Sequence, residues 1–308
     1  MSTVRAENIA YVRFRAPDLG AMRAFLLDFG LSEVAGDWDG LYVRGAGTAP
    51  FVHATHLGDA GFAALGLRLS SLADLERLAT AENATVEPLD APGGGHVARL
   101  SDPDGYCVEA VAGQAPASPL PVAPGQPWND ARAHERLRSA KRIPAGPAQV
   151  LRLGHAVLNV SNFRASERWY KDRFGFITSD EIAVSPEFSL GAFMRCDLGD
   201  TPTDHHTLFL AQAPGGPGFN HAAFEVGDLD DLMRGHNHLA TAGRIQEWGV
   251  GRHVLGSQVF DYWRDPWGHK LEHWTDGDLF TAADGSRTAT VADLLGVQWG
   301  PAMPATFG

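Results

Sequence analysis

The feature that most constrains the fold is an internal repeat, because the second half of the chain follows the plan of the first. In each half, strand-like and helix-like segments recur in the order strand, helix, strands, and then in that order again. Repeats of this length indicate duplicated structural units rather than short solenoid modules, and the mixture of elements predicts an α+β fold. The matching segments are residues 9–14 and 153–158, 61–69 and 218–226, and 102–109 and 265–272.

Local signals in the second half predict two helices and several strands. Ser161 is a candidate N-terminal cap for a helix that ends at Gly175, and Asp228 is a candidate cap for a second one. Two histidines on the second helix, His236 and His238, are expected to be solvated. The apolar stripe of the first helix comprises Phe163, Ser166, either Trp169 or Tyr170, and Phe174. Strands are predicted at residues 208–210, 219–226 and 259–263.

With 308 residues, of which 44% are hydrophobic and 20% charged, the chain is long enough for two globular domains, each with its own core. Seven prolines between residues 113 and 149 predict an extended connection, because proline interrupts both helices and sheet ladders. Within this connection, residues 132–142 are basic and are expected to form a short solvated helix. The predicted division is a domain at residues 1–113, a linker at 114–149, a domain at 150–276 and a tail at 277–308.

Charge and cysteine content restrict the partners and the compartment. The formal net charge of −12 argues against nucleic acid as a partner. Cys107 and Cys196 are the only cysteines, one in each half, which is typical of a reducing compartment and excludes a disulfide framework. No apolar stretch approaches the roughly 20 residues of a membrane span, and the first residues lack the layout of a signal peptide. We therefore expect a cytoplasmic protein that binds no membrane.

Two histidines and one carboxylate in the second half are candidate metal ligands. His155 and His221 lie near the starts of predicted strands, and Glu272 lies on the strand that follows an Asp-Pro turn. Because side chains alternate across a strand, the three can face one cavity if their strands share a curled sheet. Two imidazoles and a carboxylate hold a divalent metal on one face and leave open positions on the other.

The repeat provides a comparison for this set. A lone histidine on an apolar strand is more often a packed core residue. The first half, however, has Tyr11, Ala64 and Glu109 at the three matching positions. One carboxylate does not assemble a metal site, so we expect the first half to be metal-free and interpret Glu109 as a polar residue at a strand end. The loss of both histidines there favours a metal-binding role for them in the second half.

These residues carry a resemblance to a known family. The stretch from His253 through Tyr262 to Glu272 is similar to the signature of the type I extradiol ring-cleavage dioxygenases of the vicinal-oxygen-chelate superfamily. The resemblance covers nearly the whole chain, since those enzymes also have an inactive N-terminal half and an active C-terminal half. It implies four βαβββ modules paired into two similar domains, the second of them catalytic. It also implies His155, His221 and Glu272 as ligands of non-haem Fe(II), with Mn(II) used by some members.

The same resemblance implies roles around the metal. Residues 204–207 are similar to the family segment that bears an acid–base histidine, a role that we assign to His206, with His205 as the alternative. His253 and Tyr262 are expected to act in catalysis and to hydrogen-bond the substrate oxygens. His205, Thr207 and Phe193 are further candidates for the substrate pocket, although core packing explains Thr207 and Phe193 equally well. The apolar tail is expected to pack back over the second domain, and a lid role for it is a hypothesis.

The function that the resemblance implies is that of an oxidoreductase of aromatic-compound catabolism. Its partners are a catecholic substrate and O2, both atoms of which enter the ring beside the two hydroxyl groups to give a muconic semialdehyde-type acid. Homo-oligomers are common in the family. The alternatives are another metal-dependent enzyme of the superfamily, such as a glyoxalase-like isomerase or a hydroquinone dioxygenase, or a metal-free binding protein of this fold. Glyoxalase-type sites usually have four protein ligands, whereas only three candidates are found in this sequence.

Overall fold

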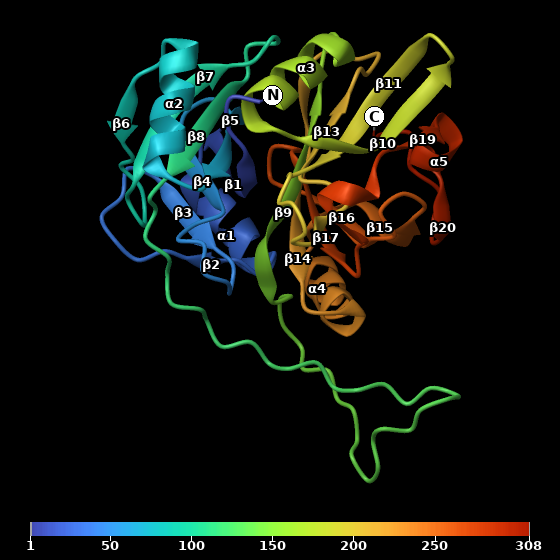
Figure 1. Cartoon of the computed structure of the whole chain (residues 1–308). Coiled ribbons are helices and arrows are strands. Elements are labelled where there is room, and N and C mark those ends of the chain that lie inside the picture. Colours follow the sequence, from blue (N-terminus) through green and yellow to red (C-terminus); the bar gives the residue numbers. More distant parts are fainter. Residues whose placement is uncertain (1, 308) are drawn as a thin grey trace.

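A computed structural model describes residues 2–307, which form four βαβββ modules, two in each half of the chain (Figure 1). The modules span residues 6–57, 61–112, 150–211 and 218–275. The α+β fold and the modular plan predicted from the repeat are therefore confirmed. Each half contributes one large sheet, and helices of the same half pack against it (Figure 1).

The sheet of the N-terminal half is centred on two antiparallel strands, β1 and β5. On their outer sides, β4 runs parallel to β1 and β8 runs parallel to β5. In sheet order, its strands are β2 (Ser32–Glu33), β3 (Leu41–Arg44), β4 (His53–Leu57), β1 (Ala6–Ala16), β5 (Gly61–Leu69), β8 (Cys107–Ala112), β7 (His96–Ser101) and β6 (Val86–Pro88).

The sheet of the C-terminal half repeats this plan and is longer, because strands of the tail join both of its edges. Its central antiparallel pair is β9 and β14, and β17 runs parallel to β14. In sheet order, its strands are β19 (Arg287–Thr290), β10 (Ile177–Ser185), β11 (Phe188–Arg195), β13 (Leu208–Ala211), β9 (Val150–Asn159), β14 (Gly218–Val226), β17 (Lys270–Thr275), β16 (Val259–Arg264), β15 (Ile245–His253) and β20 (Val297–Trp299). A separate pair joins β12 (Thr203–Asp204) to β18 (Leu279–Phe280).

The helices agree with the sequence signals except at one cap. The helix α3 begins after Asn162, whose side chain accepts from the Ala165 N–H, and not after Ser161. The reason is that Asn162 is the last extended residue and so occupies the capping position. Gly175 ends α3 with a positive φ of 70°, as predicted. The helices are α1 (Leu19–Asp28), α2 (Leu72–Glu82), α3 (Phe163–Phe174), α4 (Leu229–Thr241) and α5 (Val291–Leu295), with a 3-10 turn at Ala282–Asp284.

Two further local predictions have clear outcomes. Tyr170 is the fully buried member of the stripe on α3, and Trp169 is only partly buried against the core. Asp228 caps α4 as predicted, since its side chain accepts from the Asp231 N–H. The histidines of α4 are not free in solvent, because His236 contacts Asp261 and His238 contacts Asp28. Within residues 2–307, no helix combines the length and apolarity needed to cross a membrane.

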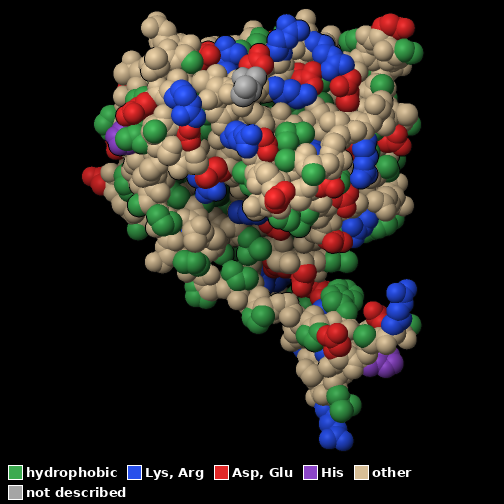
Figure 2. All heavy atoms as spheres, in the orientation of Figure 1, with side chains coloured by type: hydrophobic (Ala, Val, Ile, Leu, Met, Phe, Trp, Pro, Cys, Tyr) green, Lys and Arg blue, Asp and Glu red, His purple; other side chains and the backbone are tan. Residues whose placement is uncertain are grey.

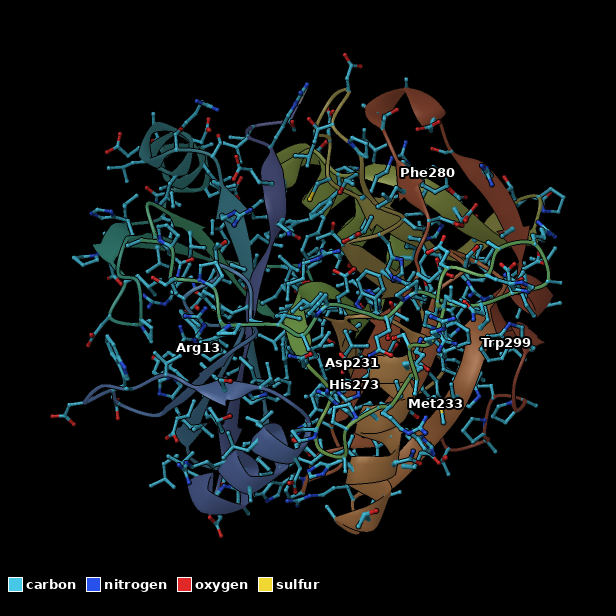
Figure 3. The ribbon with its side chains drawn as sticks, turned by 90° about the horizontal axis from the view of Figure 1, so that it is seen from below. Arg13, Asp231, Met233, His273, Phe280 and Trp299 are labelled. Carbon is cyan, nitrogen blue, oxygen red and sulfur yellow. The ribbon has the colours of Figure 1, made fainter. Side chains whose placement is uncertain are left out.

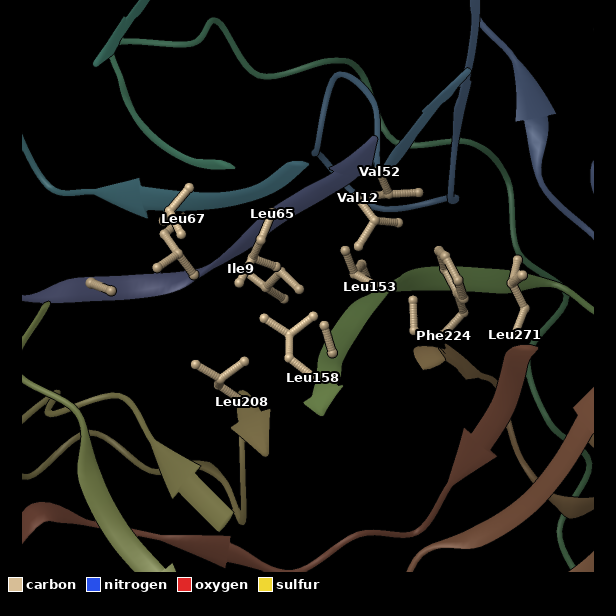
Figure 4. Packing of buried hydrophobic residues seen from close by; sticks show 14 of the residues in the cluster. Ile9, Val12, Val52, Leu65, Leu67, Leu153, Leu158, Leu208, Phe224 and Leu271 are labelled. Atoms are coloured by element: carbon tan, nitrogen blue, oxygen red, sulfur yellow. The ribbon is translucent and has the colours of Figure 1, made fainter. Parts of the chain in front are cut away.

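The two halves share one continuous hydrophobic core, which differs from the separate cores expected from the sequence. Ile9 and Leu65 of the first half lie in the same cluster as Leu153 and Leu158 of the second (Figure 4). The first strands of the two halves are the strands that meet, so the apolar faces of both sheets bury each other. The site in the second half therefore rests on a platform to which the first half contributes.

The connection between the halves stands away from the body of the molecule (Figures 1 and 2). It is extended, as the prolines predicted, but the helix predicted at residues 132–142 is absent from the described structure. Instead, Asn129 and His134 form an isolated bridge. The side chains of Asn129 and Asp130 accept hydrogen bonds from backbone N–H groups at Arg136 and Arg132. Such hydrogen bonds between side chains and the backbone favour a turn over a helix. A helix here would also lack a neighbouring surface against which to bury one of its faces.

The tail returns across the C-terminal sheet. Its strands pair with β10 at one edge and with β15 at the other. The buried guanidinium of Arg195 fastens the tail, because it donates to the carbonyls of Thr281 and Gly285 as well as to that of Thr178 on β10. The tail thus becomes part of the wall around the site described next.

Candidate metal centre and active site

Three neighbouring strands bring the candidate ligands to one face of the C-terminal sheet. His155 on β9 lies directly opposite Ala223 on β14, and Ala223 lies beside Glu272 on β17. His221 lies two residues before Ala223 and therefore shares its face. The sequence-predicted set thus converges through strand register. The matching positions in the first half have the same register, since Tyr11 pairs with Gly66 and Gly66 pairs with Glu109.

The ligand atoms of the three residues are close enough to share one ion. Nε2 of His155 lies 3.2 Å from Oε2 of Glu272, and Nε2 of His221 lies 3.4 Å from the same oxygen. All three ligand atoms lie within 4.8 Å of one another, and no other such group of three occurs in residues 2–307. The side chains are buried, with exposed fractions of 1% for His155, 6% for His221 and 0% for Glu272.

The chemistry of this donor set fits a divalent cation. Burial lowers the pKa of His155 to about 3 and lowers that of His221 well below its ordinary value, so both imidazoles are neutral, the form that coordinates a metal. Burial raises the pKa of Glu272 to about 8, and neither of its oxygens has a well-formed hydrogen bond among the described residues. A buried carboxyl group without partners is costly. A cation between the three side chains would remove that cost.

Neighbouring contacts orient two of the ligand strands. The Asn220 amide oxygen lies 2.9 Å from Nδ1 of His221, which leaves Nε2 of that ring as the lone-pair donor. Next to Glu272, His273 points to the opposite face and its Nε2 donates to the Phe29 carbonyl at 2.7 Å. That bond ties β17 to the first half, and Figure 3 labels His273 at this junction. The N-terminal half therefore helps to fix the position of the Glu272 carboxylate.

His253 and Tyr262 form a pair beside the ligands. Nε2 of His253 lies 2.9 Å from the Tyr262 hydroxyl and 3.9 Å from Oε1 of Glu272. Tyr262 lies directly opposite Glu272 on the neighbouring strand, and its ring packs against Trp248. Burial lowers the pKa of His253 to about 4 and raises that of Tyr262 well above its ordinary value. Both groups are therefore neutral hydrogen-bonding partners at neutral pH.

His206 lies on the other side of the ligands, with its ring centroid 4.0 Å from that of His155. Burial lowers the pKa of His206 well below its ordinary value. Of the two adjacent histidines, His206 lines the pocket, whereas His205 lies behind it and contacts Asp180. The acid–base role predicted for His206 is thus compatible with its position, and the alternative assignment to His205 is not supported by the geometry.

A cavity of about 190 Å³ opens beside the candidate ligands, and His155 and His221 line it. Phe193, a predicted substrate contact, lines it, but Thr207 and His205 do not, contrary to expectation. The reason is that Thr207 points to the opposite side of the chain, where its hydroxyl lies 3.4 Å from Cys196 Sγ. Most of the cavity wall is apolar, and its lining residues include no Lys, Arg, Asp or Glu. Its apolar members are Val157, Leu190, Phe193, Phe209, Ala211, Ala213, Pro214, Trp248, Leu255, Leu294, Leu295, Met303 and Phe307.

The tail supplies part of this wall and so packs back over the second domain, as the sequence predicted. The Phe307 ring lies 4.8 Å from the ring of Tyr262, edge to face, and 6.1 Å from that of His221. Trp248 Nε1 donates to the Pro301 carbonyl at 2.9 Å, which fastens this end of the tail. Residues of the tail therefore touch the side chains that surround the ligands.

The equivalent place in the first half is filled by a cluster of ionic and polar side chains. The Tyr11 hydroxyl donates to Glu109 at 2.8 Å, and guanidinium groups of Arg13 and Arg99 lie 3.1 and 3.0 Å from the same carboxylate. Glu109 is 3% exposed, so the interpretation of this residue as a polar strand end was wrong. Figure 3 labels Arg13 among the strands of this half. In the first half, guanidinium groups thus balance the negative charge of Glu109. The matching position in the second half belongs to the candidate metal site.

Comparison with known proteins gives a family match for the second half of the chain and several similar relatives. Residues 152–273 match the Glyoxalase/Bleomycin resistance protein/Dioxygenase superfamily, in agreement with the signature found in the sequence. Metapyrocatechase 2 of Cupriavidus necator is 33% identical over 211 residues, which are 67% of this chain and 61% of that protein. The match therefore covers less than two thirds of the length of this relative.

Two further similarities extend over nearly the whole chain. The iron-dependent extradiol dioxygenase of Rhodococcus jostii (strain RHA1) is 25% identical over 287 residues, which are 88% of this chain and 89% of that protein. Among solved structures, the Mn(II)-bound glyoxalase from Novosphingobium aromaticivorans is similar with a TM-score of 0.81 and 25% identity, and the match covers 99% of this chain and 94% of that one. The chain thus resembles both dioxygenases and a glyoxalase of one superfamily.

Proposed function

We propose that this chain is an extradiol dioxygenase, which inserts both atoms of O2 into a catechol beside its two hydroxyl groups. The single observation that carries the proposal is the three-residue set His155, His221 and Glu272, flanked by His206 on one side and the His253–Tyr262 pair on the other. The relatives named metapyrocatechase and extradiol dioxygenase support it.

We propose Fe(II) as the ion that His155, His221 and Glu272 hold, with Mn(II) as the alternative. Two imidazoles and one carboxylate are the ligand set of non-haem Fe(II) oxygenases. When bound, the ion would supply a common attachment point and an electron path for the catechol and O2. A relative whose name includes iron supports Fe(II), and a similar structure with Mn(II) keeps the alternative open.

The side chains around the ligands would position the substrate and move its protons. The Tyr262 hydroxyl and Nε2 of His253 lie side by side and would hydrogen-bond a catechol oxygen as negative charge forms on it. From the opposite side, Nε2 of His206 would accept a proton from the substrate and return it when the ring opens. The apolar wall would hold the ring in place and exclude water, which strengthens these polar contacts.

The pocket lining indicates an uncharged catechol as the substrate. Its polar side chains are histidines, amides and Tyr262, and it has no lysine or arginine to pair with a carboxylate. Burying an unpaired carboxylate costs several kcal/mol. We therefore propose that any substituent on the ring is apolar and lies against the wall to which Leu294, Leu295 and Phe307 contribute.

Protein purified anaerobically and reconstituted with Fe(II) should turn catechol and 3-methylcatechol into yellow ring-fission products. A catechol that bears a carboxylate should be cleaved with a kcat/KM at least about 10-fold lower, because no cation compensates its burial. Spectrophotometric assays with the three compounds test this expectation. Equal kcat/KM values would contradict the apolar selection, and no product from any of the three would contradict the dioxygenase proposal.

A glyoxalase-like isomerase is the second candidate, and the similarity to the Mn(II)-bound glyoxalase favours it. Such sites usually have four protein ligands, and the donor set here has three. Metal analysis separates the possibilities. About one iron per chain with ring cleavage supports the dioxygenase, zinc or nickel with isomerisation of a hemithioacetal supports the isomerase, and a chain that takes up no metal is a binding protein.

We further propose that two copies associate through the arm at residues 122–146. The arm exposes Leu137 and Trp128, with exposed fractions of 82% and 55%. It carries five basic and two acidic side chains, a charge of +3. Since the whole chain has a net charge of −12, the rest of the chain carries −15. Opposite charges favour docking of the arm on the body of another copy. In sedimentation equilibrium, Leu137→Glu should weaken self-association at least about 10-fold, and a wild-type monomer would contradict the proposal.

A further inference from the structure

Behind His206 lies a chain of buried polar contacts that leads away from the pocket. Oδ2 of Asp180 lies 2.7 Å from Nε2 of His205, and Nδ1 of His205 lies 3.1 Å from Nδ1 of His206. Asp180 is 6% exposed, His205 1% and His206 3%. The three side chains come from β10 and from the loop between β12 and β13, so they meet only in the folded protein.

The fold fixes the position of His205 at several points. Its backbone carbonyl accepts from the Ser179 hydroxyl at 2.6 Å, and its backbone N–H donates to the Asp278 carbonyl at 2.9 Å. On the ring side, a Cβ atom at Gly256 would lie only 3.0 Å from Nδ1 of His205. Glycine at this position thus leaves the ring its space, and His205 has little freedom to turn away from Asp180 or His206.

With both imidazoles neutral, these contacts specify one arrangement of the protons. A carboxylate accepts hydrogen bonds and does not donate them, so Nε2 of His205 carries the proton toward Asp180. In a neutral imidazole the other nitrogen is then an acceptor, so Nδ1 of His205 accepts from the Nδ1–H of His206. Nε2 of His206 is left without a proton, and His206 lines the pocket above the ligands.

We infer that Asp180 and His205 are positioning residues, which together hold His206 in the tautomer that presents an unprotonated Nε2 to the substrate. The inference rests on the proposed function, in which His206 accepts a substrate proton. It goes beyond that function by assigning roles to two side chains outside the pocket. An imidazole in the opposite tautomer would present an N–H and would be unable to act as the initial base.

The nitrogen-15 shifts of the imidazole rings test the inference in metal-free protein, because they distinguish protonated from unprotonated ring nitrogens. Signals of His206 are assigned by their loss in a His206→Asn variant. In the wild type, Nδ1 of His206 should be protonated and Nε2 unprotonated. The reverse pattern would overturn the inference without any variant, and without any reference to activity or to the proposed reaction.

Variants of Asp180 extend the test. Asp180→Leu has a similar shape but no acceptor, so His206 should lose its single Nε2-unprotonated form, and kcat with Fe(II) and catechol should fall at least about 10-fold with little change in KM. Asp180→Glu retains an acceptor and should keep both the tautomer and most of the activity. An unchanged His206 signal in Asp180→Leu would overturn the inference.

The matched control is Asp204→Leu. Asp204 is the residue before His205, but it pairs with Arg152 and contacts neither histidine. Arg152 keeps Glu225 as a partner in this variant. Asp204→Leu should leave the His206 tautomer unchanged. If it shifts the tautomer as much as Asp180→Leu does, loss of either carboxylate has the same effect, and the specific role of Asp180 is overturned.

Discussion

Replacing Glu272 with Gln is expected to lower the affinity for Fe(II) by at least about 100-fold and to abolish ring cleavage. Loss of a residue that merely orients a ligand costs about 10–100-fold in metal affinity, and Glu272 would be a ligand itself. The substitution keeps the size of the side chain and removes the carboxylate that would bind the ion beside His155 and His221, whose Nε2 atoms lie 3.2 and 3.4 Å from its Oε2. Equilibrium dialysis with Fe(II) under anaerobic conditions, followed by metal analysis, measures the effect.

The stability of the metal-free variant distinguishes a binding role from a structural one. Neither carboxylate oxygen of Glu272 has a well-formed hydrogen bond among the described residues, so the substitution removes no strong protein contact of this kind. The free energy of unfolding without metal should therefore change by less than about 1 kcal/mol. Iron retained at one per chain in the variant, or a large loss of stability without metal, would contradict the assignment of Glu272 as a ligand.

Much of the fold was accessible from the sequence because the repeat gives each pattern twice. The comparison of positions between the halves supported the three candidate ligands, and strand register explains why that comparison works. His155, Ala223 and Glu272 form one row across the sheet, and Tyr11, Gly66 and Glu109 form the equivalent row. A register is inherited with the fold, so residues at matching positions face matching places.

The residues that the sequence did not reveal lack such a pattern. Asp180 lies 25 positions before His205 on a separate strand, and no spacing rule connects them. For Arg13 the sequence does contain a signal, because a residue two positions after Tyr11 on a strand lies on the same face of the sheet. Its role nevertheless depends on Glu109, whose carboxylate lies on β8. The helix predicted at residues 132–142 was wrong because local composition favours a helix only weakly when nothing packs against it.

Glu109 occupies the position in the first half that matches Glu272, and its replacement is expected to have the opposite outcome. Replacing Glu109 with Gln should leave iron content and turnover unchanged and should lower the free energy of unfolding by about 3 kcal/mol. Arg13, whose side chain is 13% exposed, would lose its carboxylate partner at 3.1 Å. Burial acts to lower the pKa of Arg13, and the Glu109 charge more than offsets it, so the native pKa lies above the ordinary value. Removing one partner of a buried pair costs about 3–5 kcal/mol.

The expected loss is at the lower end of the range for buried pairs because Arg99, the second cation at Glu109, is 47% exposed. Water can therefore hydrate the Arg99 guanidinium when the Glu109 carboxylate is removed. The Tyr11 hydroxyl can still donate to the amide oxygen of Gln. Urea unfolding of the metal-free protein should therefore show a lower midpoint with an unchanged slope. If Glu109→Gln lost iron, or unfolded like the wild type, the ionic cluster would not be the structural replacement for a metal centre. Opposite outcomes at the two glutamates would show that one strand register supports catalysis in one half and stability in the other.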